Sequence, residues 1–391
     1  MHQAGFSAPE LEATLERLAA RLGLRGQFFS TPTSLWFGLD EGAGQRTYLE
    51  RVEPAPIDLG RLAELHRLAE RVAAGEMTAA QAAPLVDWIA AQRPRYGNRT
   101  TIAALALSSG TSAVFLGGGA REAAAGAAIG FVTGLLAWRL GRFERGSLLF
   151  EPLGAALAAF LALGWAALLP PLSVYVATLA GIIFLIPGFT LTVALSELAS
   201  RHLSSGTARF AGAIMVFMTI TFGVAIGSQL GGALFAAPAG ALPALPPAWA
   251  DLAALAAAPL ALTVLFRAPL AEYPWILAVG VAGFLTARAG GALVSPELGM
   301  FAGALAIGLA SRLYARLRRM PEVMTSVPAI LLLVPGSIGY RSLASLMQSE
   351  VVLGIETAFR MIVIAVSLVA GLLLASVAAP GARPGRSRSG S

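Results

Sequence analysis

The sequence predicts a mainly α-helical, polytopic membrane protein with ten transmembrane helices in two inverted five-helix repeats, preceded by a small soluble α/β domain. Composition is the first observation behind this fold class. Of the 391 residues, 56% are hydrophobic and only 13% are charged, whereas soluble domains have about 25% charged residues. The second observation is a series of apolar segments, most of them close to the roughly 20 residues that a helix needs to cross a bilayer. The third is an internal repeat shared by the two halves of that series.

The residues before position 100 have the pattern of a soluble domain. Ser7, Asp58 and Thr78 are N-cap residues that predict three amphipathic helices. Between the first two helices, Gln27–Leu39 and Thr47–Val52 are rich in strand-forming residues and predict short strands on either side of a Gly-Ala-Gly turn. We therefore expect a small α/β domain here, and no cleavable signal peptide opens it.

Ten apolar segments follow this domain. They cover residues 101–119, 122–138, 152–169, 173–196, 209–235, 252–267, 273–288, 297–313, 326–346 and 354–377. The predicted parts of the chain are a cytoplasmic domain (1–99), a first five-span module (100–236), an external Pro/Ala-rich linker (237–250), a second five-span module (251–378) and a disordered basic tail (379–391).

The arginines indicate the orientation of these spans. If the amino-terminal domain is cytoplasmic, the loops after spans two, four, six, eight and ten carry most of the loop arginines. The opposite loops at 169–173 and 236–249 carry none, and Arg121 and Arg288 are the exceptions to the pattern. Because cytoplasmic loops are enriched in Arg and Lys, both termini are expected in the cytoplasm. The same placement accounts for the net charge of +6 without a nucleic-acid partner.

Spans four and five recur as spans nine and ten at an offset of 148 residues. The residues that coincide are Pro187 with Pro335, Gly188 with Gly336, Leu198 with Leu346, Gly206 with Gly354, and Gly223 with Gly371. Because spans four and nine are five apart, they cross the membrane in opposite directions. Inverted repeats of this kind are typical of carriers that expose one central site alternately to the two sides.

Each copy carries a Pro-Gly pair inside an apolar run. Pro removes a backbone donor and Gly permits unusual backbone angles, so the freed backbone groups must face protein, water or a ligand. One interpretation is a helix kink relieved by neighbouring helices; the other is a substrate site near mid-membrane. For the second, the predicted substrate-binding residues are Pro187, Gly188, Thr190, Ser196, Pro335, Gly336, Ser337, Tyr340 and Arg341.

Charged residues within spans are functional candidates because their burial in lipid is costly. We expect Arg341 and exposed helix N-termini to bind a carboxylate, and Glu197 and Glu356 to carry the coupling proton. Glu356 and Arg360 have the spacing of a helical ion pair. The remaining charged residues near span ends are expected to lie in the membrane interface: Arg121, Glu122 and Arg209.

Other classes of protein have less support. The chain has no Cys, and no metal or cofactor motif occurs. An intramembrane serine hydrolase would use Ser108-Ser109-Gly110, but none of the three histidines, His2, His66 and His202, lies deep in a predicted span. A channel stays open as an alternative, since broken helices also line pores. Neither the oligomeric state nor the role of the amino-terminal domain follows from the sequence.

Several segments resemble the bacterial threonine/serine exporter family. They are LIPG, LVPGSIGYRSL, the SSGTARF loop, and the STPTSL and Ala55–Leu59 regions of the amino-terminal domain. The similarity covers nearly the whole chain, and in the family the first amino-terminal helix starts earlier than it does here. The resemblance implies a non-enzymatic exporter of threonine and serine in the bacterial cytoplasmic (inner) membrane, an antiporter driven by the proton motive force. Some relatives in which the two modules are separate subunits export dicarboxylates such as succinate, so a dicarboxylate is the alternative substrate.

Overall fold

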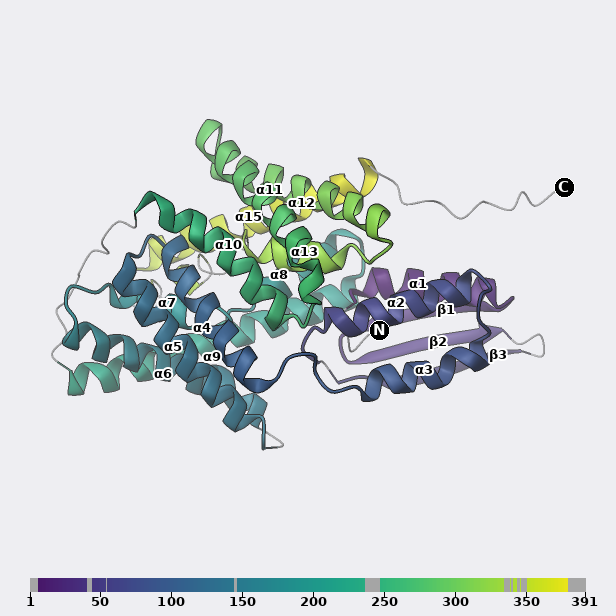
Figure 1. Ribbon diagram of the computed structural model, residues 1–391, viewed down its shortest axis with the longest axis horizontal. Coiled ribbons are helices and arrows are strands. Elements are labelled where there is room, and N and C mark those ends of the chain that lie inside the picture. Colours follow the sequence, from purple (N-terminus) through teal and green to yellow (C-terminus); the bar gives the residue numbers. More distant parts are fainter. Residues whose placement is uncertain are drawn as a thin grey trace.

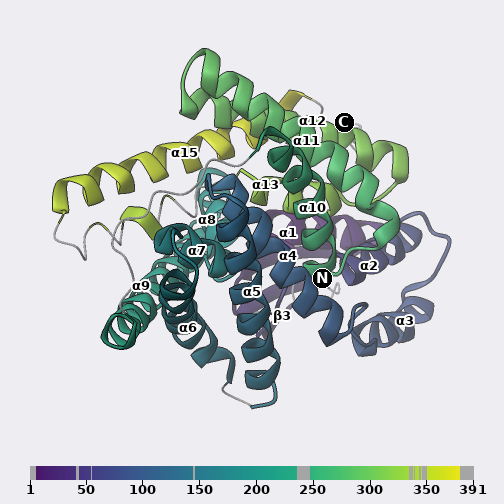
Figure 2. The same ribbon diagram turned by 60° about the vertical axis from the view of Figure 1, so that its left-hand side comes forward.

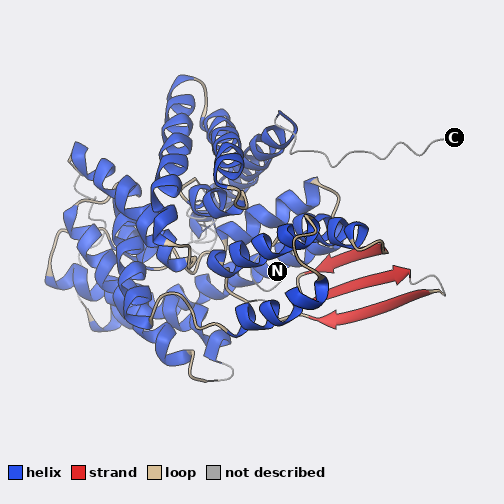
Figure 3. Cartoon of the chain, turned by 45° about the vertical axis from the view of Figure 1, so that its right-hand side comes forward, coloured by secondary structure: helices blue, strands red, loops and turns tan. Residues whose placement is uncertain are grey.

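The computed structural model describes residues 6–40, 44–53, 55–143, 146–235, 247–333, 338, 340–342, 345 and 350–378. The predicted linker, apart from its last residues, and the predicted basic tail lie outside the described residues. A large helical body joins the amino-terminal domain, whose three-stranded sheet forms one end of the molecule (Figures 1 and 3).

The amino-terminal domain contains α1 (Ala8–Arg21), β1 (Arg25–Thr31), β2 (Ser34–Asp40), β3 (Gln45–Arg51), α2 (Leu59–Ala73) and α3 (Ala79–Ala91). The three predicted N-caps are confirmed: for example, the Asp58 carboxylate accepts a hydrogen bond of 3.0 Å from the Arg61 amide at the start of α2. The structure has strands in the predicted range 27–39, but two of them. A tight turn between Thr31 and Ser34 divides it, so that β1-β2-β3 form an antiparallel meander.

The helical body consists of two units with matching elements. The first unit contains α4 (Asn98–Phe115), α5 (Ala120–Leu140), α6 (Gly146–Leu168), α7 (Val174–Gly181), α8 (Gly188–Ala199) and α9 (Leu203–Leu234). The second contains α10 (Ala248–Leu265), η2 (Leu270–Glu272), α11 (Tyr273–Leu293), α12 (Pro296–Arg318), α13 (Val323–Leu331) and α15 (Val351–Ala378). The starts of α4 and α10 are 150 residues apart, those of α7 and α13 are 149 apart, and those of α9 and α15 are 148 apart.

Helix packing also agrees between the units. In the first unit α4 contacts α5 and α7, α5 contacts α6 and α7, and α6 contacts α7 and α9. The second unit has every corresponding contact, with α10, α11, α12, α13 and α15 in these positions. In each unit two long helices pack against each other, α6 with α9 in the first and α12 with α15 in the second. These two helix pairs lie on either side of the α4–α10 contact (Figure 2).

One pair of glycines shows how close this agreement is. A Cβ on Gly223 of α9 would lie 2.3 Å from the Pro152 carbonyl oxygen of α6, and a Cβ on Gly371 of α15 would lie 2.4 Å from the Phe301 carbonyl oxygen of α12. Real Cβ atoms do not approach a backbone oxygen so closely, so both contacts require glycine. The coincidence of these two glycines in the sequence therefore corresponds to one packing contact that occurs twice.

The predicted number of spans is confirmed only in part. Among the described residues, six helices are long and apolar enough to cross a membrane: α5, most of α6, α9, η2 with α11, α12 and α15. At the predicted fourth and ninth spans the chain instead forms short helices, α7 and α8 in the first unit and α13 in the second. At the first span, α4 carries six Ser and Thr residues, which lower its hydropathy. The ten-span inverted topology therefore stays a prediction.

Each unit contributes residues that pack into the other unit. Helix α8 of the first unit contacts α13 and α15 of the second, and Tyr340 of the second unit is buried in the apolar core of the first. The amino-terminal domain also crosses over: Leu59 and Leu62 of α2 share an apolar core with Phe266 and Met324 of the second unit. The sequence boundary at residue 99 is therefore not a boundary between separate cores.

Candidate functional site

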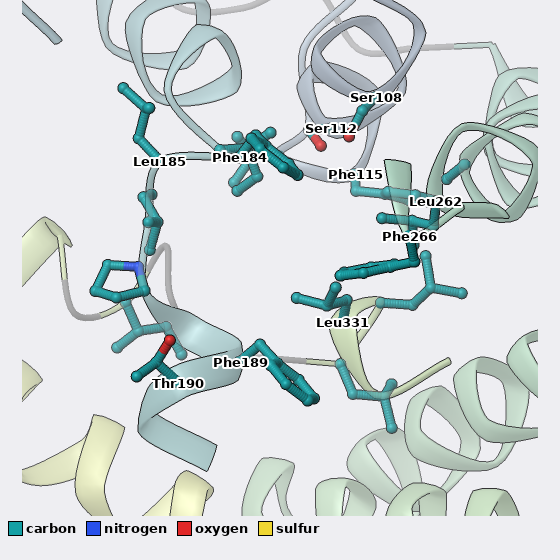
Figure 4. A pocket seen from close by; sticks show the side chains of 18 of the residues that line it. Ser108, Ser112, Phe115, Phe184, Leu185, Phe189, Thr190, Leu262, Phe266 and Leu331 are labelled. Carbon is teal, nitrogen blue, oxygen red and sulfur yellow. The ribbon is translucent and has the colours of Figure 1, made fainter. Parts of the chain in front are cut away.

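A central cavity of about 550 Å³ lies where the two units meet. Residues of α4, α6 and the α7–α8 connection line it from the first unit, and residues of α10, α11, α12 and α13 line it from the second. Both interrupted regions border it, because Ile183–Pro187 and Leu331–Leu333 are among its lining residues. Figure 4 shows the α7–α8 connection on one side and Leu331 and Phe266 on the other.

The break in the first unit follows the predicted Pro-Gly pair. Helix α7 ends at Gly181, a turn follows, and α8 begins at Gly188 with Pro187 as its N-cap. The Gly188 and Leu191 amides bond to the Ile186 and Pro187 carbonyls. The amides of the two residues between them, Phe189 and Thr190, donate to no described residue, and both residues line the cavity. A helix N-terminus with open amides can accept an anionic group.

The polar side chains of the cavity come from the first unit. Ser108 and Ser112 lie one turn apart on α4, with their hydroxyl oxygens toward the cavity (Figure 4). Thr190 adds a third hydroxyl, and Glu151 of α6 is the one charged residue among the described lining residues. In the part of the chain that the structure describes, no side-chain hydrogen bond or ion pair engages these four groups, which leaves them open to a ligand.

The rest of the lining is apolar. Phe115, Phe184, Phe189, Phe266 and Phe284 surround the polar groups together with aliphatic side chains. A mostly apolar cavity with a few polar groups is typical of a site for a small organic molecule. Among the described residues no three His, Asp or Glu side chains lie close enough to hold a metal ion.

The predicted binding residues fall into three groups. Pro187 and Thr190 line the cavity, and Gly188 begins the helix beside it. Ser196 lies further along α8 and is not a lining residue, whereas Tyr340 is buried in the core of the first unit. Arg341 is exposed and is not among the lining residues. Three predicted residues lie outside the described part of the chain: Pro335, Gly336 and Ser337.

Glu197 lies in a different environment from the cavity. Its carboxylate is 1% exposed, pairs with Arg209 at 3.1 Å, and accepts hydrogen bonds from the Ser205 hydroxyl and from the Ala8 amide at the start of α1. The carboxylate therefore joins α8, α9 and the amino-terminal domain, and its predicted role in proton coupling stays a prediction.

The other predicted charged residues also have different partners from those expected. Glu356 is exposed on α15, and Arg360 lies 3.9 Å from Glu297 of α12 instead of pairing with Glu356. The position expected for Glu122 in the membrane interface stays a prediction, but its side chain is buried in the protein. Its carboxylate is 2% exposed and accepts hydrogen bonds from the Gly119 and Ser173 amides, because it caps two helices at once.

Two parts of the site were missed in the sequence. The sequence pattern singles out Ser108 only as a possible hydrolase nucleophile and does not single out Ser112. The predicted third segment begins at residue 152 and leaves Glu151 outside it. Helix α6 instead begins at Gly146, which places this carboxylate inside the helix. An isolated acidic residue one position before a long apolar run was the available signal.

The apolar helices indicate a polytopic membrane protein, and two units with interrupted helices around a shared cavity are typical of transporters. Comparison with known families agrees with this class. The ThrE model, described as "Putative threonine/serine exporter", matches residues 1–231, and the ThrE_2 model, described as "Threonine/Serine exporter, ThrE", matches residues 251–378. The chain belongs to the threonine/serine exporter family.

Two curated yeast proteins are similar to this chain. An uncharacterized protein of Schizosaccharomyces pombe is 25% identical over 319 residues, which are 77% of this chain and 37% of the relative. The pheromone-regulated membrane protein 10 of Saccharomyces cerevisiae is 27% identical over 177 residues, 44% of this chain and 46% of the relative. The chain thus spans less than half the length of either relative. No solved structure matches it.

Proposed function

We propose that this protein is a secondary active exporter of threonine and serine that binds its substrate in the central cavity. The observation that carries this proposal is the combination of open amides at the α8 N-terminus, three hydroxyls and one carboxylate in a single apolar cavity. Membership of the exporter family supports the same substrate class.

The groups of the cavity complement those of a small hydroxy amino acid. The open amides of Phe189 and Thr190 can bind the substrate carboxylate, and Glu151 can bind its ammonium group through a charge-assisted hydrogen bond. Ser108 and Ser112 can bond to the substrate hydroxyl, as both donors and acceptors. A dicarboxylate fits less well, because the described lining contains a carboxylate and no cationic side chain.

We further propose that transport is coupled to protons and proceeds by alternating access. Movement of the two units about their shared cavity would open it to one side and then to the other. Glu151 can exchange a proton with water on one side and bind the substrate ammonium in its ionised form on the other. The expected location is the bacterial inner membrane, with both termini in the cytoplasm, as the distribution of arginines predicts.

The test is efflux of labelled threonine, serine and succinate from cells that express the protein, with and without an uncoupler. We expect efflux of threonine and serine that the uncoupler abolishes, and little efflux of succinate. Efflux of succinate alone would contradict the proposed substrate, and an unchanged rate with the uncoupler would contradict proton coupling.

Counterflow in proteoliposomes separates a carrier from a channel. Preloading with unlabelled threonine should accelerate uptake of labelled threonine, because a carrier returns faster when it is loaded. A pore would show no such acceleration, and that result would contradict alternating access.

A further inference from the structure

A second hollow, lined by charged residues, lies away from the central cavity. It has a volume of about 820 Å³ and lies between α1 and α2 of the amino-terminal domain and the end of α12 with the segment that follows it. Six arginines line it: Arg17, Arg67, Arg71, Arg312, Arg316 and Arg319. We call it the arginine groove.

The carboxylates of the arginine groove do not neutralise these arginines. Glu70, Glu76 and Glu322 are its three acidic lining residues, so six positive charges face three negative ones. Each of the three lies near one arginine: Arg17 is 3.2 Å from Glu70, Arg71 is 3.7 Å from Glu76, and Arg312 is 3.4 Å from Glu322. Among the described lining residues, the arginines therefore outnumber the glutamates by three.

Two further groups in the groove influence this charge. Burial lowers the pKa of His66, so its imidazole is neutral near pH 7 and adds no charge. Burial raises the pKa of Glu322, which weakens its negative charge as the pH falls. The positive surplus is thus a property of the arginines and does not disappear near neutral pH.

Arg319 is an exposed arginine of the groove. It follows the last residue of α12 with a left-handed backbone, at φ 52, which is unfavourable for a residue with a side chain. Within the described ranges no residue makes a hydrogen bond or ion pair with its guanidinium, although it lines the groove.

General rules for arginine placement do not explain every arginine of the groove. Arginines at the end of α12 are favourable at a helix C-terminus and on the cytoplasmic side of a membrane. The helix rule also covers Arg71 in the last turn of α2, but neither rule applies to Arg17 and Arg67, which belong to the amino-terminal domain and face the same hollow. Arg67 also contacts the loop after α12 directly, with its Nη2 atom 3.3 Å from the Met320 sulfur.

We propose that the arginine groove binds a phosphate-bearing anion that links the amino-terminal domain to the second unit. Guanidinium groups bind phosphate oxygens in pairs of hydrogen bonds, and a multivalent anion would relieve the repulsion among the arginines. Since α13 begins directly after the groove and ends at the central cavity, such an anion would connect the cytoplasmic domain to the helix bordering the transport site. This binding site is separate from the proposed transport function.

The first measurement is calorimetric titration of sodium pyrophosphate into the purified full chain in nanodiscs of neutral phosphatidylcholine. We expect binding to the unchanged protein, and binding weaker by about tenfold or more in the double variant R316Q/R319Q, because each lost bond is to a charged group. The matched control is R139Q/R142Q, which removes the same charge at the end of α5, outside the groove. Arg319→Gln alone serves as a second variant if the double variant does not fold.

The second measurement distinguishes a soluble anion from a lipid headgroup. Thermal unfolding is compared in nanodiscs with and without phosphatidylglycerol. If a headgroup is the ligand, phosphatidylglycerol raises the melting temperature of the unchanged protein and of R139Q/R142Q, but not that of R316Q/R319Q. Either a pyrophosphate effect or a phosphatidylglycerol effect confined to the groove supports the proposal. Failure of both probes, or equal effects in the two double variants, would overturn it.

Discussion

The two five-helix units share a scaffold but differ in the chemistry that they bring to the cavity. Helices α4 and α10 have the same length and lie 150 residues apart, so Ser108 corresponds to Ala258 and Ser112 to Leu262. Glu151 corresponds to Met300, because each directly precedes the residue whose carbonyl oxygen lies against the packing glycine, Gly223 or Gly371. All six members of these three pairs line the same cavity. The polar residues of the first unit are thus apolar in the second.

The same contrast holds outside the cavity. The first unit has a buried ion pair between Glu197 and Arg209, and at the offset of 148 residues the second unit has Ser345 and Thr357 in these positions. Backbone contacts constrain both units equally, because a methyl group would not fit in either. Side-chain chemistry has no such constraint, so one unit can provide the binding groups and the other the apolar wall.

Arg209→Met is expected to have the largest effect on stability. It leaves the Glu197 carboxylate buried without its cation, and loss of one partner of a buried pair costs about 3 to 5 kcal/mol. Thermal and denaturant unfolding in detergent measures this loss. The control is Arg288→Met, which breaks the exposed pair with Asp251 and should cost less than about 1 kcal/mol. Equal losses of stability in the two variants would show that the Glu197–Arg209 pair stabilises the protein no more than the exposed pair does.

Glu151→Gln should reduce threonine efflux about 100-fold, because it removes a charge-assisted bond to the substrate ammonium. The matched change in the second unit, Met300→Gln, should reduce efflux much less. Initial efflux rates, normalised to the amount of folded protein, provide the comparison. If both variants lose the same activity, the binding groups are not confined to the first unit.

Gly223→Ala and Gly371→Ala should each destabilise the protein by about 1 to 3 kcal/mol, because the new methyl group collides with a carbonyl oxygen. Gly212→Ala on α9 is the control, since a Cβ there has no neighbour within 4 Å, and it should keep or raise the melting temperature. Destabilisation by only one of the first two substitutions would indicate that the two units are not packed alike.

Ser112→Ala should weaken threonine transport by about two- to tenfold through loss of one neutral hydrogen bond. A hydroxyl added to the wall of the second unit, in Ala258→Ser at the position that corresponds to Ser108, should leave transport nearly unchanged. The half-saturating threonine concentration in proteoliposomes measures both. An unchanged value in Ser112→Ala would remove this hydroxyl from the site.

Arg341→Ala is expected to have the smallest effect. The sequence alone predicts loss of efflux, because an arginine near a broken helix suits a carboxylate. In the structure its side chain is exposed and does not line the cavity, so we expect efflux within about twofold of the unchanged protein, the range of a surface substitution. Loss of efflux in a folded variant would instead support a role for Arg341 in substrate binding.

Some of the site could be predicted from the sequence because it depends on local rules. Pro187 and Gly188 indicated the break between α7 and α8, since Pro cannot continue the hydrogen-bond pattern of a helix. The cavity partners of this break could not be predicted in the same way. Glu151 lies 36 residues before Pro187 in the chain, and only the packing of α6 against its neighbours brings the two to one cavity.

The sequence by itself determined the membrane character, the duplicated units and the position of the first break, because hydropathy, periodicity and Pro-Gly chemistry act over short distances along the chain. Only the tertiary structure decided which charged residues face the cavity and which are buried anchors. Glu197 and Glu151 are both carboxylates in apolar helices, yet one meets Arg209, Ser205 and the Ala8 amide, whereas the other borders the cavity without a described partner. The physical reason is that the groups around a carboxylate determine whether it is a structural anchor or a binding group, and those groups come from distant parts of the chain.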